Sequence, residues 1–176
     1  MLNYLAVSVI TNDQPGLVEK ISSLASKHDC NVEDSRMMIV GVEFAALMLI
    51  SGNWGQIAKT EKALDKLSAQ PNYLIQYKRT EEYQPSNNEL PYSIQAVLLD
   101  GPGLIRQISD FFAKRKINIG NLQTDSYKAP HTGAPMLEVE LEVNIPSTVQ
   151  ISEIRESFAE LCDELNIDAS FEAIKP

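Results

Sequence analysis

The chain has 176 residues, a formal net charge of −9, two cysteines and two histidines. This length fits one ordinary domain or two small ones, and two cysteines are too few for a disulfide framework. No apolar run reaches the roughly 18 residues that span a bilayer, and no basic region precedes the short apolar stretch at the N-terminus. We therefore predict a cytoplasmic protein with no membrane partner.

The acidic charge is unevenly distributed along the chain. Residues 1–80 hold eight basic and eight acidic side chains, whereas residues 81–176 hold seven and sixteen, so the whole excess lies in the second part. Contact with a phosphate backbone needs a basic patch. We expect no direct binding of nucleic acid, and any effect on nucleic acid would pass through another protein.

The first 80 residues alternate between strand-like and helix-like patterns. Pro15-Gly16 separates the first apolar run from the first helical stretch, and Gly41 marks a tight turn between two extended runs. The predicted strands are Tyr4–Thr11, Asn31–Val40, Val42–Ser51 and Tyr73–Lys78, and the predicted helices lie around Leu17–Ala25 and Ile57–Leu67. The order is βαββαβ.

The same pattern returns 87 residues later. Asp13-Gln-Pro-Gly-Leu-Val18 corresponds to Asp100-Gly-Pro-Gly-Leu-Ile105, and Asn31 corresponds to Asn118. The predicted elements of the second copy are strands at Tyr92–Leu99, Asn118–Tyr127, Met136–Asn144 and Ile167–Ile174, and helices at Leu104–Arg115 and Ile151–Leu165. Two copies of one unit are therefore expected, as domains 1–80 and 92–176 with a polar linker at 81–91.

A βαββαβ unit predicts an α+β, ferredoxin-like fold, with an antiparallel sheet and both helices on one face. Val42–Ile50 is apolar on both faces, so we expect the first domain's open sheet face to pack against the other domain or a second chain, as in a homo-oligomer. Leu137 to Val143 instead alternates with Glu138, Glu140 and Glu142, which predicts a solvated face. The second hairpin also carries an insertion, Lys128–Pro135.

The loop before each first helix is the best candidate for a binding site. The first N–H groups of a helix lack intrahelical partners and favour anions. Gly16 and Gly103 allow a ligand to approach the backbone closely. Asp13 and Asp100 each add a carboxylate to the loop. Such a set suits a zwitterion, for example a free amino acid. The alternative is that the aspartates only cap the helices and the Pro-Gly pairs only shape turns.

Asn31 and Asn118 have two interpretations as well. Asn is a common turn residue, and it also has the donors and acceptor that hold a small polar ligand. We expect the fold to bring Asn31 near Asp13 and Gly16.

Other functions find little support in the sequence. His28 and His131 belong to no spaced metal-ligand set and no nucleophile-elbow or Walker pattern occurs, so we predict no enzyme, cofactor or metal site. RNA-recognition domains of the same topology need aromatic side chains and a basic sheet. Acylphosphatase-like enzymes need a phosphate cradle in the first loop. The carboxylates of Asp13 and Asp100 lie in this loop and disfavour a phosphate there.

The last predicted helix has an acidic outer face opposite its apolar stripe. Such a face is usually only solvated surface, but it is also the most plausible docking ground for a basic partner. Its acidic residues are Glu153, Glu156, Glu160, Asp163 and Glu164.

The motif Asp-x-Pro-Gly-Leu-Val/Ile, an apolar helix and then Asn-Val/Ile resembles the ACT domain in both copies. Cys30–Arg36, Gly41–Phe44 and Met48–Gly52 further resemble the glycine cleavage system transcriptional repressor family, which consists of two tandem ACT domains without a catalytic or DNA-binding domain. The resemblance implies that such a protein restrains a LysR-type activator of transcription, and that glycine relieves this restraint. An alternative is an amino-acid-sensing regulatory subunit of a metabolic enzyme.

The same resemblance implies ligand contacts in both copies, often at an interface between two units. They are Asn12, Asp13, Gln14, Pro15, Gly16, Leu17, Val18 and Asn31 in the first copy, and Leu99, Asp100, Gly101, Gly103, Leu104, Ile105 and Asn118 in the second. The copies differ where Gly101 replaces Gln14 and where Gly120-Asn121-Leu122 replaces Glu33-Asp34-Ser35. If only one loop binds a ligand, we expect it to be the first.

Overall fold

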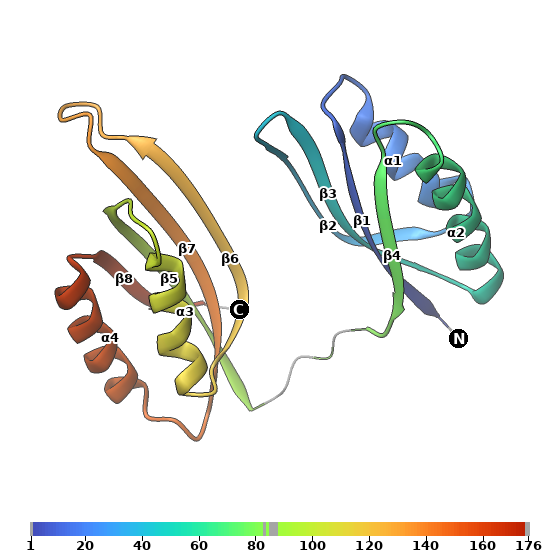
Figure 1. Cartoon of the computed structure of the whole chain (residues 1–176). Coiled ribbons are helices and arrows are strands. Elements are labelled where there is room, and N and C mark those ends of the chain that lie inside the picture. The colour runs from blue at the N-terminus through green and yellow to red at the C-terminus, as the bar shows by residue number, and fades with distance from the viewer. Residues whose placement is uncertain (1, 83, 85–87, 175–176) are drawn as a thin grey trace. The chain divides into compact units, whose positions relative to one another are not determined.

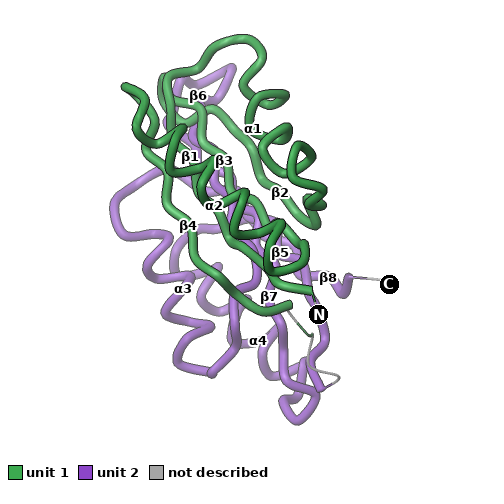
Figure 2. Tube along the Cα trace, turned by 90° about the vertical axis from the view of Figure 1, so that its right-hand side faces the viewer, with its two compact units in different colours: residues 1–84 green, residues 85–176 purple. Residues whose placement is uncertain are grey.

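The chain forms two compact units, as a computed structural model shows (Figures 1 and 2). Unit 1 is residues 1–84 and unit 2 is residues 85–176. The structure describes residues 2–82, 84 and 88–174, so residues 83 and 85–87 of the predicted linker lie outside the described part. Each unit has the predicted α+β, ferredoxin-like βαββαβ order.

In unit 1 both helices cover one face of a four-stranded antiparallel sheet with the order β2-β3-β1-β4 (Figure 1). The elements are β1 (Asn3–Asn12), α1 (Leu17–Ser26), β2 (Asn31–Val40), β3 (Glu43–Gly52), α2 (Trp54–Ser68) and β4 (Leu74–Thr80). Period-two alternation buries Leu5, Val7 and Val9 of β1 against the helices. The i, i+4 spacing of α1 buries Leu17 and Ile21 against the same core.

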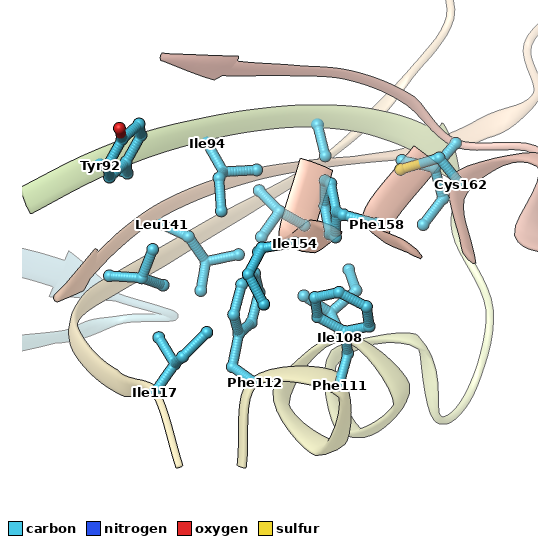
Figure 3. Close-up of a cluster of buried hydrophobic side chains, with 14 of the residues drawn as sticks. Tyr92, Ile94, Ile108, Phe111, Phe112, Ile117, Leu141, Ile154, Phe158 and Cys162 are labelled. Atoms are coloured by element: carbon cyan, nitrogen blue, oxygen red, sulfur yellow. The ribbon is translucent and has the colours of Figure 1, made fainter. Parts of the chain in front are cut away.

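Unit 2 repeats this arrangement with the sheet order β6-β7-β5-β8. Its elements are β5 (Glu89–Leu99), α3 (Leu104–Lys114), β6 (Asn118–Lys128), β7 (Pro135–Pro146), α4 (Ile151–Leu165) and β8 (Asp168–Ala173). Strand β5 begins at Glu89, three residues before the predicted Tyr92. The core is built around Phe111, Phe112 and Phe158, whose ring centroids lie 5.0 to 5.7 Å apart (Figure 3).

The open sheet faces of the two units differ in chemistry. In unit 1 the register aligns Met38, Ala45, Ile10 and Leu74 in one row across the four strands, and Leu47, next along β3, is 59% exposed. In unit 2 the corresponding face carries Glu138, Glu140 and Glu142, which are exposed as predicted. Further carboxylates on this face are Asp125, Asp168 and Glu172.

Candidate ligand-binding loops

The first candidate loop joins the end of β1 to α1, and its turn depends on Gly16. This residue has φ +90° and ψ 0°, in the left-handed region, and stands at the N-cap of α1. The Lys20 amide donates to the Gly16 carbonyl at 2.9 Å. The preceding N–H groups, of Leu17, Val18 and Glu19, have no intrahelical acceptor because they begin the helix. They present three donors at the positive end of the helix dipole.

Asp13 does not cap α1, which contradicts the capping alternative for this residue. The helix has no side-chain cap, and within the described residues the Asp13 carboxylate has no hydrogen bond or ion pair. It is exposed, as are Asn12, Gln14 and Pro15. The loop therefore offers one solvent-facing carboxylate and a set of backbone donors.

The side chain of Leu17 is not available to a ligand. It is 3% exposed and packs in the core of unit 1, so only its backbone N–H can take part in binding. The next residue, Val18, is 53% exposed and can offer its side chain to a ligand.

The second candidate loop joins β5 to α3 with the same backbone geometry. Gly103 has φ +86° and ψ 0°, and α3 also lacks a side-chain cap, so Asp100 is not a cap either. Here, however, the carboxylate is engaged, because Ser126 Oγ donates to Asp100 Oδ2 at 3.3 Å. The Asp100 amide donates to the Pro135 carbonyl at 2.9 Å.

The insertion of the second hairpin therefore lies beside the second loop. Pro135 ends the predicted insertion and begins β7, and the insertion closes on itself through Ala129 N–H to the Ala134 carbonyl at 2.8 Å. Sequence reasoning noted the insertion but missed this contact. The signal was the hairpin register, which brings its closed end to the edge where β5 ends.

Asn31 and Asn118 lie at the opposite end of their sheets from the loops, so the expectation that Asn31 lies near Asp13 and Gly16 within one unit is wrong. Asn31 is opposite Ser51 at one end of β3, whereas Asn12 is opposite Glu43 at the other. About nine residues of strand separate them, or about 30 Å at roughly 3.3 Å per residue. Asn118 is likewise opposite Asn144, at the far end of β7 from Leu99.

Asn31 belongs to a small polar network at the start of β2. The Ser51 hydroxyl donates a hydrogen bond to Glu33 Oε1. Hydrogen bonds from Ser51 and Asn31 lower the pKa of the Glu33 carboxyl below its usual value of 4.5. Glu33 occupies a bulge, since the register between β2 and β3 shifts between Val32 and Asp34. Sequence reasoning did not identify this network.

Comparison with known proteins assigns the family. The family model of the ACT domain matches residues 3–78. The glycine cleavage system transcriptional repressor of Escherichia coli K12 is 30% identical over 172 residues, which cover 98% of this chain and 90% of the repressor. The chain belongs to the glycine cleavage system transcriptional repressor family.

Two solved structures extend this similarity over the whole length of this family member. A protein of unknown function from Galdieria sulphuraria has a TM-score of 0.82 at 26% identity and covers 99% of this chain and 100% of its own. A crystal structure provisionally assigned as a glycine cleavage system transcriptional repressor has a TM-score of 0.73 at 26% identity, covering 100% and 99%. Both therefore share the fold of this chain along its whole length.

None of the helices among the described residues has the length and apolar composition that a membrane span requires. Within the same residues, no three His, Cys, Asp or Glu side chains gather as a metal ion would require.

Proposed function

We propose that this family member is an amino-acid-responsive regulator that controls transcription by binding a LysR-type activator protein rather than DNA. The observation that carries the proposal is the first loop, where the exposed Asp13 carboxylate belongs to the same short loop as the first N–H groups of α1, which have no intrahelical acceptor. A free amino acid needs both kinds of partner, a carboxylate for its ammonium group and N–H donors for its carboxylate.

Glycine is the favoured ligand, because the related protein from E. coli is a repressor of the glycine cleavage system. A ligand without a side chain also needs no apolar pocket. The first loop is favoured over the second, since Asp13 is open whereas Asp100 already accepts a hydrogen bond from Ser126.

Asn31 can complete such a site only from another βαββαβ unit, because about 30 Å of strand separates it from the loop of its own unit. The proposal therefore includes a second copy of the chain, whose Asn31 adds an amide to the ligand bound at the first loop. An exposed Asn31 at the edge strand β2 fits this role.

Regulation requires that the amino acid binds two states of the activator interface with different affinities. Glycine that favours the unbound state releases the activator, and by reciprocity the activator weakens glycine binding. No enzymatic step is needed for this response.

The test is a thermal-shift screen against the free amino acids, followed by copurification with and without the best ligand. We expect stabilisation by a small amino acid, and release of a LysR-type activator on its addition. Copurification of a biosynthetic enzyme in place of the activator would favour a regulatory subunit. No stabilisation by any amino acid at millimolar concentration, which corresponds to roughly 4 kcal/mol of binding free energy, would contradict the proposal for the chain alone.

A further inference from the structure

In unit 1, side-chain hydrogen bonds connect the second helix to the last strand at the edge of the sheet. Tyr77 of β4 donates its hydroxyl to Asp65 of α2 at 2.7 Å. Arg79 of β4 forms two hydrogen bonds to the Glu61 carboxylate of α2, at 2.8 and 2.9 Å. These polar ties join the helix to the strand across the edge of the sheet.

At the matching edge of unit 2, between the described elements α4 and β8, neither of these hydrogen-bonded pairs is present. Tyr77 and Phe171 occupy equivalent places, since they lie opposite Val7 and Ile94. The equal lengths of α2 and α4 align Asp65 with Cys162. In the same way, Phe158 replaces Glu61 and Ala173 replaces Arg79. Residues without a hydrogen-bonding side-chain pair therefore occupy the positions where unit 1 has its two hydrogen-bonded pairs.

A groove of about 380 Å³ lies beside β8 at this edge. Its apolar lining includes Phe158 and Cys162, which project from α4 (Figure 3). Asp163, Asp168 and Arg155 also line it, and the guanidinium carbon of Arg155 lies 5.2 Å from the Phe171 ring centroid. The groove is therefore lined by both apolar and charged side chains, and two of the charged ones are acidic and one is basic.

Strand β8 is an edge strand, and its outer side pairs with no strand among the described residues. The Ile174 amide donates to the Pro91 carbonyl at 3.0 Å. In an antiparallel ladder alternate residues turn to the same side, so the N–H groups of Ala169, Phe171 and Ala173 point outward. An extended segment can add to such an edge and place every second side chain into the groove.

We propose that the α4–β8 edge binds an extended segment of a partner protein in which apolar and basic residues alternate. The apolar residues enter the groove, and the basic residues lie on the open sheet face beside Asp168 and Glu172. Both carboxylates are exposed and next to the added strand, where cross-strand pairs of opposite charge are favourable. The same carboxylates disfavour a second copy of β8 as the occupant.

The proposal deepens the proposed function by giving the protein partner a surface, but it needs no amino acid. Binding is therefore measured in amino-acid-free buffer, so that its failure leaves the ligand test at the first loop unaffected. The probe is a fluorescent peptide of about nine alternating valine and lysine residues, a length that matches a strand. The controls are a peptide with glutamate for lysine and one with the same residues in two blocks.

We expect saturable binding of the valine–lysine peptide alone. Ala173→Pro removes an outward donor without touching the β5 ladder, and Ala159→Trp fills the groove from an exposed position of α4. Each should weaken binding at least about tenfold. Lys62→Trp at the equivalent position of α2 should leave the binding of this peptide unchanged. The double variant Asp168→Asn, Glu172→Gln should weaken peptide binding and reduce the salt dependence of that binding.

Circular dichroism establishes that each variant is folded. Equal binding of the control peptides, no saturable binding, or unchanged affinity in folded Ala173→Pro would overturn the proposal. So would sedimentation that shows a dimer which Ala173→Pro dissociates, because the occupant would then be a second copy.

Discussion

Gly16 is required for its backbone conformation rather than for space. A Cβ built on Gly16 meets nothing within 4 Å, but its φ of +90° is strained for any other residue. We expect Gly16→Ala to lower the free energy of unfolding by about 1–2 kcal/mol, measured by urea denaturation. The matched control is Gly55→Ala in α2, which should raise it by up to about 1 kcal/mol. Equal effects of the two variants would contradict this account of the turn.

Glu33 should report the polar network at the start of β2. Because hydrogen bonds from Ser51 and Asn31 lower its pKa in the folded state, the stabilisation is present above about pH 4.5 and is lost as the pH falls through the lowered value. Ser51→Ala should move the pKa of Glu33 back toward 4.5, as followed by NMR titration of the carboxyl carbon. A pKa that stays unchanged in Ser51→Ala would show that Ser51 does not hold the charge.

At the scale of elements, helix α2 is stabilised by a capping box. Asn53 accepts from the Gln56 amide at 3.0 Å, and Gln56 Oε1 accepts from the Asn53 amide at 2.6 Å. Asn53→Ala should cost about 1 kcal/mol and lower the midpoint of thermal unfolding. Gln150 at the N-cap of α4 makes no such bond, so Gln150→Ala should change stability by less than about 0.5 kcal/mol.

Period and turn chemistry predicted most elements within about two residues. Strand β2 has the predicted bounds, Asn31–Val40. The turn at Gly41 ends it, and the next apolar run begins directly after that turn. Strand β5 began earlier than predicted, since Glu89 to Pro91 read as linker by composition but pair with β7. The bulge at Glu33 was also missed, because strand periodicity carries no signal for one unpaired residue.

The candidate loops were predictable and the place of Asn31 was not. Asp13 and Gly16 belong to one short loop, so their proximity follows from sequence alone. Asn31 is separated from them by α1, and its distance depends on whether β2 starts or ends at the loop. Only the register of β2 against β3 decides this, and it places Asn31 at the far end.

At the scale of the whole molecule, the open face of unit 1 stays a predicted interface. Because Leu47 and Met38 are at least half exposed there, covering the face removes apolar area from water. If a second copy covers it, Leu47→Glu should weaken self-association in sedimentation velocity, whereas Glu140→Gln on the acidic face of unit 2 should not. A chain that is monomeric at every concentration would contradict coverage by a second copy.

Calorimetric titration of glycine tests the central claim most directly, comparing the unchanged chain with Asp13→Ala and with its counterpart Asp100→Ala. We expect saturable binding of glycine to the unchanged chain. Binding should be weakened at least about tenfold in Asp13→Ala, since a hydrogen bond to a charged group contributes about 1.5–3 kcal/mol, and it should be nearly unchanged in Asp100→Ala. Absence of saturable heat at millimolar glycine, or equal affinity in Asp13→Ala, would contradict this claim.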